Sequence, residues 1–170
     1  MKDNSVTLAE VLESRDERAA RQAYLLREYP APLVSFTVVC PGPVKQTKTS
    51  GMLFSEGVKA LEKELADNNI PVLFKETREK KTGNEALYSV GTDEKTLKRL
   101  CSGIEDTHRY GRLFDMDVIS RDGAPVSRTE LGMPGRKCLL CGRDAHACAR
   151  SRAHSVEELQ KEIERLTKDE

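Results

Sequence analysis

The stretch GRLFDMDVI, residues 111–119, has the pattern of a β-strand and carries two acidic side chains two positions apart. Successive side chains of a strand point to opposite faces of a sheet, so Phe114 and Met116 are expected to enter the core. The opposite face is then expected to carry Leu113, Asp115, Asp117 and Ile119. Neighbouring carboxylates repel each other and are costly to desolvate unless water or a cation reaches them. The stretch predicts either a solvated sheet face or a site for Mg²⁺ and the phosphate oxygens of a substrate.

The patterns around this stretch predict the fold. Residues 33–40 are almost continuously apolar, as in a central strand, and a helix is expected at about 52–68. A hairpin with strands at 71–78 and 86–90 comes next, followed by a second helix. The order strand–helix–strand–strand–helix–strand over residues 33–119 is the split βαβ core of a ferredoxin-like α+β fold. In such a fold the helices cover one sheet face, and the acidic face is expected to stay open for a substrate.

The chain is expected to add an N-terminal and a C-terminal helix to this core, at residues 6–29 and 156–168. Each begins with a capping-box sequence, in which Thr7 and Ser155 are the capping residues. With this length the chain can bury its own core, and residues 1–170 are predicted to form a single catalytic domain.

Composition narrows the class of protein. Basic and acidic residues number 28 each, so the formal net charge is zero and no overall field attracts nucleic acid. Aromatic residues make up only 5% and tryptophan is absent, which argues against a base-stacking surface. No apolar run is long enough for a membrane span, and the first residues do not resemble a signal peptide. The protein is therefore expected to be cytoplasmic, with neither nucleic acid nor membrane as a partner.

A basic, cysteine-rich region follows the acidic stretch. Between residues 108 and 154 there are nine Lys/Arg against five Asp/Glu, a local charge of +4 in a neutral chain. Arginines beside a carboxylate pair suit a polyphosphate that is carried with its metal ion. The alternative interpretation is an ordinary basic surface.

Three of the five cysteines lie within eleven residues of the segment 136–154. The odd total and this crowding fit reduced thiols or a metal site better than a set of disulfides. Cys138, Cys141, Cys148 and His154 are the ligand types of a tetrahedral Zn²⁺ site. The competing interpretations are a short helix that packs its small side chains on the core, and thiol catalysis.

Two further candidates for the site lie outside these stretches. His108 directly precedes the acidic strand and is the best general-base candidate. Lys45 follows a Pro-Gly-Pro turn between a strand and a helix, where a phosphate can bind. The charge-dense run 14–22 is expected to be a solvated helix face on which Glu17 pairs with Arg21.

Four blocks of sequence, taken in order, resemble one family. They are SRDER at 14–18, PLVSFTVV and PGP within 32–43, GRLFDMDV at 111–118, and RKCLLC with CAR and His154 within 136–154. Together they resemble the apo-citrate lyase phosphoribosyl-dephospho-CoA transferase family, also called citrate lyase holo-acyl-carrier-protein synthase.

The resemblance implies an enzyme of the nucleotidyltransferase type. A serine of the apo acyl carrier subunit of citrate lyase would attack triphosphoribosyl-dephospho-CoA at the phosphate nearest the ribose, and pyrophosphate would leave. With this chemistry, Asp115 and Asp117 are expected to hold Mg²⁺, and Asp16 or His108 to accept the serine proton. The expected phosphate ligands are Arg15, Lys45, Arg112 and Arg136. The alternative is a zinc-stabilised, non-catalytic module that docks on an acyl carrier or lyase complex.

Overall fold

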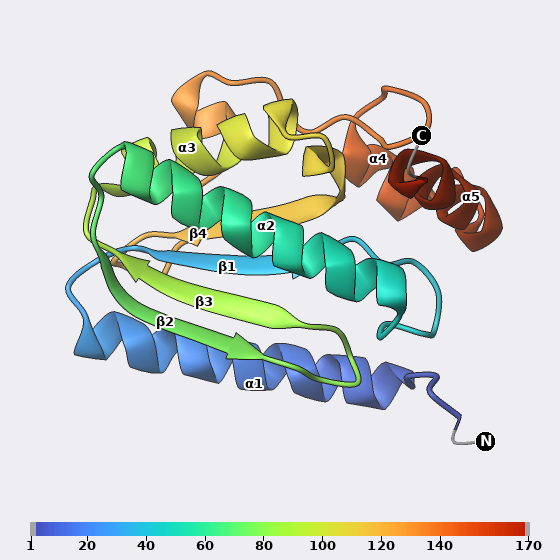
Figure 1. Ribbon diagram of the computed structural model, residues 1–170, viewed down its shortest axis with the longest axis horizontal. Helices are drawn as coiled ribbons and strands as arrows, with labels where there is room; N and C mark the ends of the chain where they lie inside the picture. Colours follow the sequence, from blue (N-terminus) through green and yellow to red (C-terminus); the bar gives the residue numbers. More distant parts are fainter. Residues whose placement is uncertain (1–2, 169–170) are drawn as a thin grey trace.

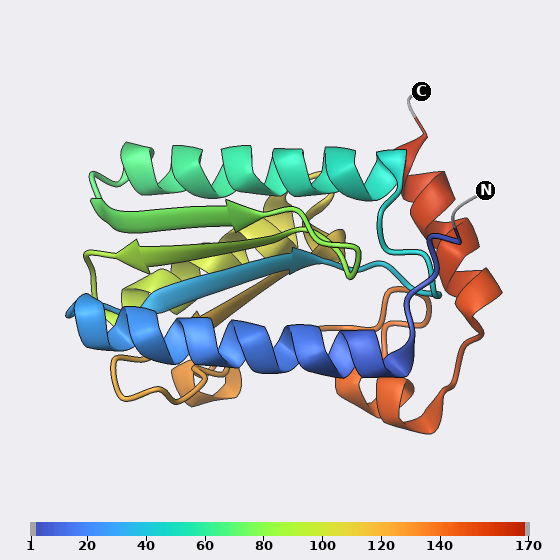
Figure 2. The ribbon, with the colours of Figure 1, turned by 90° about the horizontal axis from the view of Figure 1, so that it is seen from below.

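The computed structural model describes residues 3–168, which form one antiparallel sheet with helices on both faces (Figures 1 and 2). The strands are β1 (Leu33–Val38), β2 (Val72–Arg78), β3 (Glu85–Val90) and β4 (Phe114–Ile119). Their order in the sheet is β2-β3-β1-β4, and every neighbouring pair is antiparallel. This order confirms the ferredoxin-like α+β prediction for residues 33–119.

The helices are α1 (Leu8–Glu28), α2 (Lys48–Asp67), α3 (Glu94–Thr107), α4 (Ala145–Ser151) and α5 (Val156–Thr167), with 3₁₀ turns η1 (Gly111–Leu113) and η2 (Thr129–Leu131). The helices α1 and α5 begin where their capping residues predict. Capping boxes are present at Thr7 and Ser155 as expected, and Thr47 starts α2 four residues earlier than predicted. In the described part of the chain no helix combines the length and the apolarity needed to cross a bilayer.

The main hydrophobic core lies between the sheet and the helices α2 and α3 (Figure 2). Phe36 of β1 is fully buried there and stacks on Phe54 of α2, with ring centroids 5.3 Å apart. The edge of the same ring meets Phe114 of β4 at 5.6 Å. These aromatic contacts join the central strand, an edge strand and a helix, and so fix the acid-bearing strand to the core.

Gly57 marks a close approach of α2 to the sheet. A Cβ atom at this position would lie 2.1 Å from Cζ of Phe36. Gly57→Ala is therefore expected to lower the free energy of unfolding by about 2 kcal/mol, although alanine has the higher helix propensity. Gly103→Ala in α3 is the matched control, since a Cβ atom there meets nothing within 4 Å. Urea denaturation of both variants checks this packing, and equal stabilities would contradict it.

The second face of the sheet is not left open, contrary to the expectation from the sequence. α1 lies across it, on the opposite side of the sheet from α2 (Figure 2). The fully buried Leu25 packs there against Leu33 of β1 and Leu87 of β3. α1 contacts β3 and the β2–β3 hairpin, whereas the side chains of Asp115 and Asp117 on β4 remain accessible.

Polar contacts hold the rest of α1 to the hairpin. Ser14 is hydrogen-bonded to Thr82 at 2.9 Å, and Nε of Arg18 donates to the buried carboxylate of Glu85 at 2.9 Å. The predicted solvated face at residues 14–22 is therefore wrong on this side of the helix. The predicted pair within the run is also replaced, since Glu17 bonds to Lys80 and Arg21 bonds to Glu76.

The acid-bearing strand begins three residues later than predicted. Residues 111–113 form the turn η1, and Leu113 is fully buried in the main core instead of lying beside the acids. Gly111 permits this turn, because a Cβ atom there would lie 2.4 Å from the carbonyl oxygen of Glu105. The alternation of apolar and polar residues did not predict this close approach between Gly111 and the backbone of Glu105.

Candidate active site and metal centre

The segments that carry the family resemblance meet at one end of the sheet (Figures 1 and 2). The N-terminal end of α1, the loop after β1 and the helices α4 and α5 all lie there. Side-chain contacts join these segments: Gln160 of α5 donates to the carbonyl oxygen of Pro41, and Arg112 of η1 donates to that of Cys138. Residues that are distant in the sequence therefore share one region.

The two acids project from β4 on the sheet face that also carries α1. In the strand register Asp115 lies opposite Thr37, and Asp117 lies opposite Ser35. The Asp115 side chain is 47% exposed, and Asp117 is also exposed. Both carboxylates therefore lie on one accessible surface, next to small polar side chains.

The two carboxylates disfavour a double negative charge. Although part of the Asp117 side chain is exposed, the protein atoms around its carboxylate displace water, and this desolvation, and next the charge of Asp115, raise the pKa of Asp117 to about 6. Lys98 and Arg136 act in the opposite direction without cancelling this effect. A divalent cation would relieve the repulsion, and paired carboxylate oxygens are the hard ligands that Mg²⁺ prefers. The donor set of Asp115 and Asp117 therefore fits that ion.

Asp117→Asn is expected to stabilise the fold in Mg²⁺-free buffer. The raised pKa means that the folded state binds the proton more tightly than the unfolded state, so this carboxylate destabilises the fold increasingly as the pH rises from about 4 to 6. Because solvent screens an exposed group, we expect a gain of only about 1 kcal/mol at pH 7.5, and almost none near pH 4. Urea denaturation at the two pH values measures this, and a variant less stable than wild type at pH 7.5 would contradict it.

Glu105 of α3 is a buried carboxylate that joins β4 to the basic region. Its Oε2 accepts the backbone N–H of Met116 at 3.2 Å and lies 3.1 Å from Nη1 of Arg136. Its Oε1 accepts Nη2 of Arg128 at 3.0 Å. Nη1 of Arg136 is also 3.6 Å from Oδ1 of Asp115. Glu105 thus holds two guanidinium groups, of which that of Arg136 also lies near Asp115, a role that the sequence did not reveal.

A hollow of about 400 Å³ lies where these side chains meet. Its charged lining consists of Arg112, Arg128, Arg136, Lys137, Glu105 and Asp106. Two of the predicted phosphate ligands, Arg112 and Arg136, therefore come together in one hollow. Nη2 of Arg136 also donates to the backbone carbonyl of Arg112 at 3.0 Å. The hollow is of the size of small-ligand pockets, and its lining is of the kind that binds phosphates.

Two of the other candidates do not join this group. The ring of His108 packs on Phe114 at 4.9 Å, and its Nδ1 accepts the N–H of Tyr110. Phe114 belongs to the core on the other face of the sheet, so His108 is not positioned as a base for the acids. Lys45 does not line the hollow either. Its Nζ donates to the carbonyl oxygen of Cys40 at 2.6 Å.

The remaining candidates lie on the exposed surface of α1. Arg15 shares one side of the helix with Leu26, three turns further on, and Leu26 lies next to the Gly123 turn that follows β4. Arg15 is therefore on the side of α1 that faces β4. Asp16 lies nearly opposite the sheet-facing positions of the helix, and points away from the acids.

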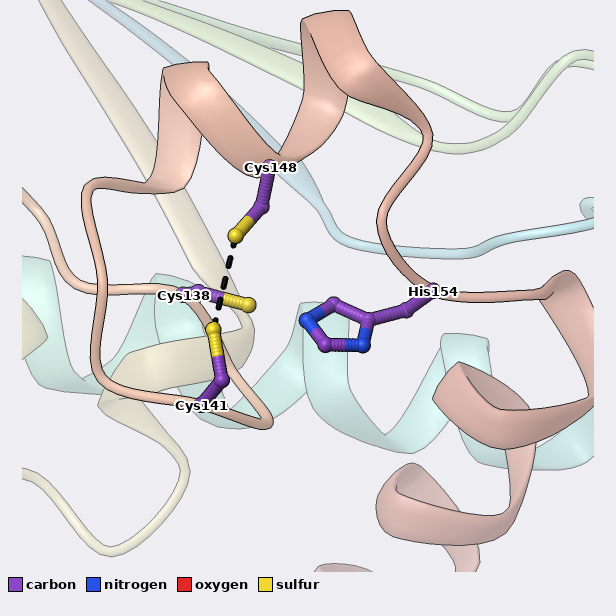
Figure 3. A group of neighbouring side chains, drawn as sticks. All are labelled: Cys138, Cys141, Cys148 and His154. Atoms are coloured by element: carbon purple, nitrogen blue, oxygen red, sulfur yellow. Dashed lines mark hydrogen bonds between the residues drawn. The ribbon is translucent and has the colours of Figure 1, made fainter.

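Four side chains of types that can bind a metal ion converge beside this region (Figure 3). The Sγ atoms of Cys138, Cys141 and Cys148 and a ring nitrogen of His154 all lie within 4.8 Å of one another. Among residues 3–168 this is the one such group of three or more ligands. Figure 3 shows the three sulfur atoms facing a common centre, with the imidazole pointing at them.

The local backbone explains how the first two cysteines meet. Cys138 and Cys141 flank a tight turn, which the N–H of Cys138 closes by donating to the carbonyl oxygen of Arg143 at 2.6 Å. Gly142 reverses the chain in the left-handed region, with φ of +71°. The N–H of Leu140 lies 3.5 Å from Sγ of Cys138, within the hydrogen-bond range for sulfur. The turn therefore presents both sulfur atoms on one side.

A short helix supplies the third sulfur and places the histidine. Asp144 caps α4 by accepting the N–H of Ala147, and Cys148 lies one turn further on. Arg152 ends the helix in the left-handed conformation, so that the chain returns with His154 next to the sulfur atoms. The interpretation in which the three cysteines share one helical face is wrong, because only Cys148 lies in a helix.

Two properties of the cluster suit the binding of a metal ion. Nε2 of His154 is buried without a hydrogen-bond partner, whereas buried polar atoms usually have one. The guanidinium of Arg143, 3.2 Å from Sγ of Cys141, lowers the pKa of that thiol to about 5 and favours the thiolate that binds metal. These four side chains can therefore hold a metal ion.

Fold and site together define a ferredoxin-like α+β protein with a carboxylate pair, a basic hollow and a Cys₃His cluster. A statistical model of the family described as apo-citrate lyase phosphoribosyl-dephospho-CoA transferase matches residues 6–170. Curated proteins with that name from Shigella boydii serotype 18, Escherichia coli O157:H7 and Shigella sonnei are each 37% identical over 166 residues, which cover 98% of this chain and 91% of each relative. The chain belongs to this family of transferases.

Proposed function

We propose that this protein transfers the phosphoribosyl-dephospho-CoA group from triphosphoribosyl-dephospho-CoA to a serine of the apo acyl carrier subunit of citrate lyase. We assign the whole reaction to one domain, which includes the segment 136–154. We also expect the protein to act in the cytoplasm. The observation that carries the proposal is the position of Arg136, between the Asp115 carboxylate and the basic hollow. A phosphate chain and its metal ion need anionic and cationic groups in this proximity.

In the proposed reaction the residues of β4 would bind the metal ion, and the residues of the hollow would bind the phosphate chain. The serine Oγ forms a bond to the phosphorus nearest the ribose, the bond from that phosphorus to the pyrophosphate oxygen breaks, and the serine proton is released. Asp115 and Asp117 would hold Mg²⁺, which supplies charge neutralisation on the transferred phosphoryl group. Arg136 orients the phosphate chain against the acids, and Arg15 approaches from α1. Asp16 and His108 are not retained as bases, because neither faces the acids.

Zn²⁺ is the ion that we assign to the Cys₃His cluster. Three thiolates and one imidazole would supply the four ligands of a structural zinc site and so leave no ligand position for a substrate. The ion would therefore be structural. By fixing Cys138, the ion would also help to position Arg112 of the hollow. The carbonyl oxygen of Cys138 accepts a hydrogen bond from Nη2 of Arg112 at 2.6 Å.

Pyrophosphate release is the reaction to measure. Purified protein, the substrate and the apo carrier should release one pyrophosphate per carrier only when Mg²⁺ is added. A carrier in which the acceptor serine is replaced by alanine is the control, and it should give no release. Stoichiometric zinc without any carrier-dependent release would instead support the non-catalytic docking module.

A further inference from the structure

We infer that the basic hollow beside β4 is a distinct subsite for the two departing phosphates, and that free inorganic pyrophosphate binds there. The inference rests on the proposed function, because it extends the phosphate chain of the substrate beyond the reacting phosphorus. It adds two residues to the site, Arg128 and Lys137, and it gives the hollow one ligand class, a diphosphate.

The hollow is a positively charged site in which two acidic side chains position some of the basic ones. Four cations and two anions line it, which leaves a formal charge of +2. Both anions are already engaged: Glu105 binds Arg128 and Arg136, and Oδ1 of Asp106 accepts Nη1 of Arg128 at 2.9 Å. A guanidinium has five N–H donors in a fixed fork, so each arginine can contact its anchor and a ligand at the same time. The anions therefore fix Arg128 and Arg136 and leave donors for an anionic ligand.

Arg128 has a buried donor that lacks an acceptor. Its side chain is only 9% exposed, and its Nε has no hydrogen-bond partner although Nη1 and Nη2 are both bound. Such a buried donor is rare in folded proteins. Arg128 lines the hollow, and phosphate oxygens make strong charge-assisted hydrogen bonds with guanidinium groups.

The connection to the acids runs through Arg136. Its Nη1 lies 3.6 Å from Oδ1 of Asp115 and 3.1 Å from Oε2 of Glu105, and its side chain lines the hollow. When the reacting phosphorus is at the acids, the next two phosphates therefore extend past Arg136 into the hollow. Cleavage leaves the electron pair of the broken bond on an oxygen of the departing pyrophosphate. The guanidinium groups around the hollow stabilise this charge as it develops.

Calorimetric titration with inorganic pyrophosphate tests the subsite without any transfer reaction. We expect the full-length, metal-loaded protein to bind one pyrophosphate per chain, and to bind orthophosphate at least about tenfold more weakly. Lys137→Gln and Arg112→Gln should each raise the Kd for pyrophosphate by about tenfold. Arg121→Gln removes one exposed positive charge outside the hollow and should change the Kd by less than about twofold. Melting temperatures of the variants report whether each one is folded.

Three results would overturn the inference: no binding of pyrophosphate by the wild-type protein, equal affinity for orthophosphate, or an equal loss in Arg121→Gln. The proposed function fails in a different way. Pyrophosphate binding that depends on Lys137, in a protein that does not modify the carrier, would sustain the subsite and reject the transferase. If the protein modifies the carrier but the substitutions in the hollow leave its Kd for pyrophosphate unchanged, the transferase proposal stands and the subsite is rejected.

Discussion

Asp115→Asn and Asp117→Asn are each expected to lower the rate of carrier modification by about 1,000-fold. Each substitution keeps the shape of the side chain but removes one of the two charges that would hold Mg²⁺ on β4. The loss should fall on kcat, because the stabilised charge develops in the transition state. Initial rates at saturating substrate and Mg²⁺ measure it.

The matched control for these variants is Asp122→Asn, in the exposed turn that follows β4. It removes the same charge a few residues away and should retain the wild-type rate. Wild-type activity in either β4 variant would remove the acids from the mechanism. A rate loss accompanied by unfolding would contradict the expectation that relief of the repulsion leaves the fold intact or firmer.

Removal of the metal is expected to have the second-largest effect. Cys148→Ser deletes one ligand of the cluster, and the variant should lose its bound zinc. The segment 136–154 would then lose its main internal link, and we expect the melting temperature to fall by roughly 10 °C. Activity should fall at least about tenfold, because Cys138 no longer positions Arg112. Elemental analysis and calorimetry of the purified variant measure both changes.

Cys40→Ser is the matched control for the metal site. Cys40 is a free, partly buried thiol whose contacts are to the carbonyl oxygens of Val44 and Lys45, outside the cluster. This variant should keep one zinc per chain and the wild-type melting temperature. Full zinc content in Cys148→Ser would contradict the four-ligand site. An unchanged fold and zinc content with activity lost only in Cys141→Ser would favour thiol catalysis.

The sequence predicted the elements of the core well because each follows a simple period. The alternation in β4 placed Asp115 and Asp117 on one face, and the capping boxes at Thr7 and Ser155 located two helix starts. The ligand types of the Cys₃His cluster were also readable from the sequence. Their convergence was not, because it depends on a left-handed glycine and on the direction in which α4 ends.

The errors have physical causes in particular residues. The sheet-facing side of α1 carries Ser14 and Arg18, so a helix that docks on a sheet looked like a solvated one. Glu105 has no motif, and only its place on the buried side of α3 distinguishes it from a surface acid. His108 is close to the acids in sequence but packs on the opposite face, because the turn η1 intervenes.

Intact-mass spectrometry of the apo acyl carrier subunit tests the central claim most directly. After incubation with the enzyme, triphosphoribosyl-dephospho-CoA and Mg²⁺, the carrier should gain one phosphoribosyl-dephospho-CoA group on its serine. The doubly substituted enzyme, Asp115→Asn with Asp117→Asn, should leave the carrier mass unchanged over the same time. Full modification by this double variant, or no modification by the wild-type enzyme, would contradict the account.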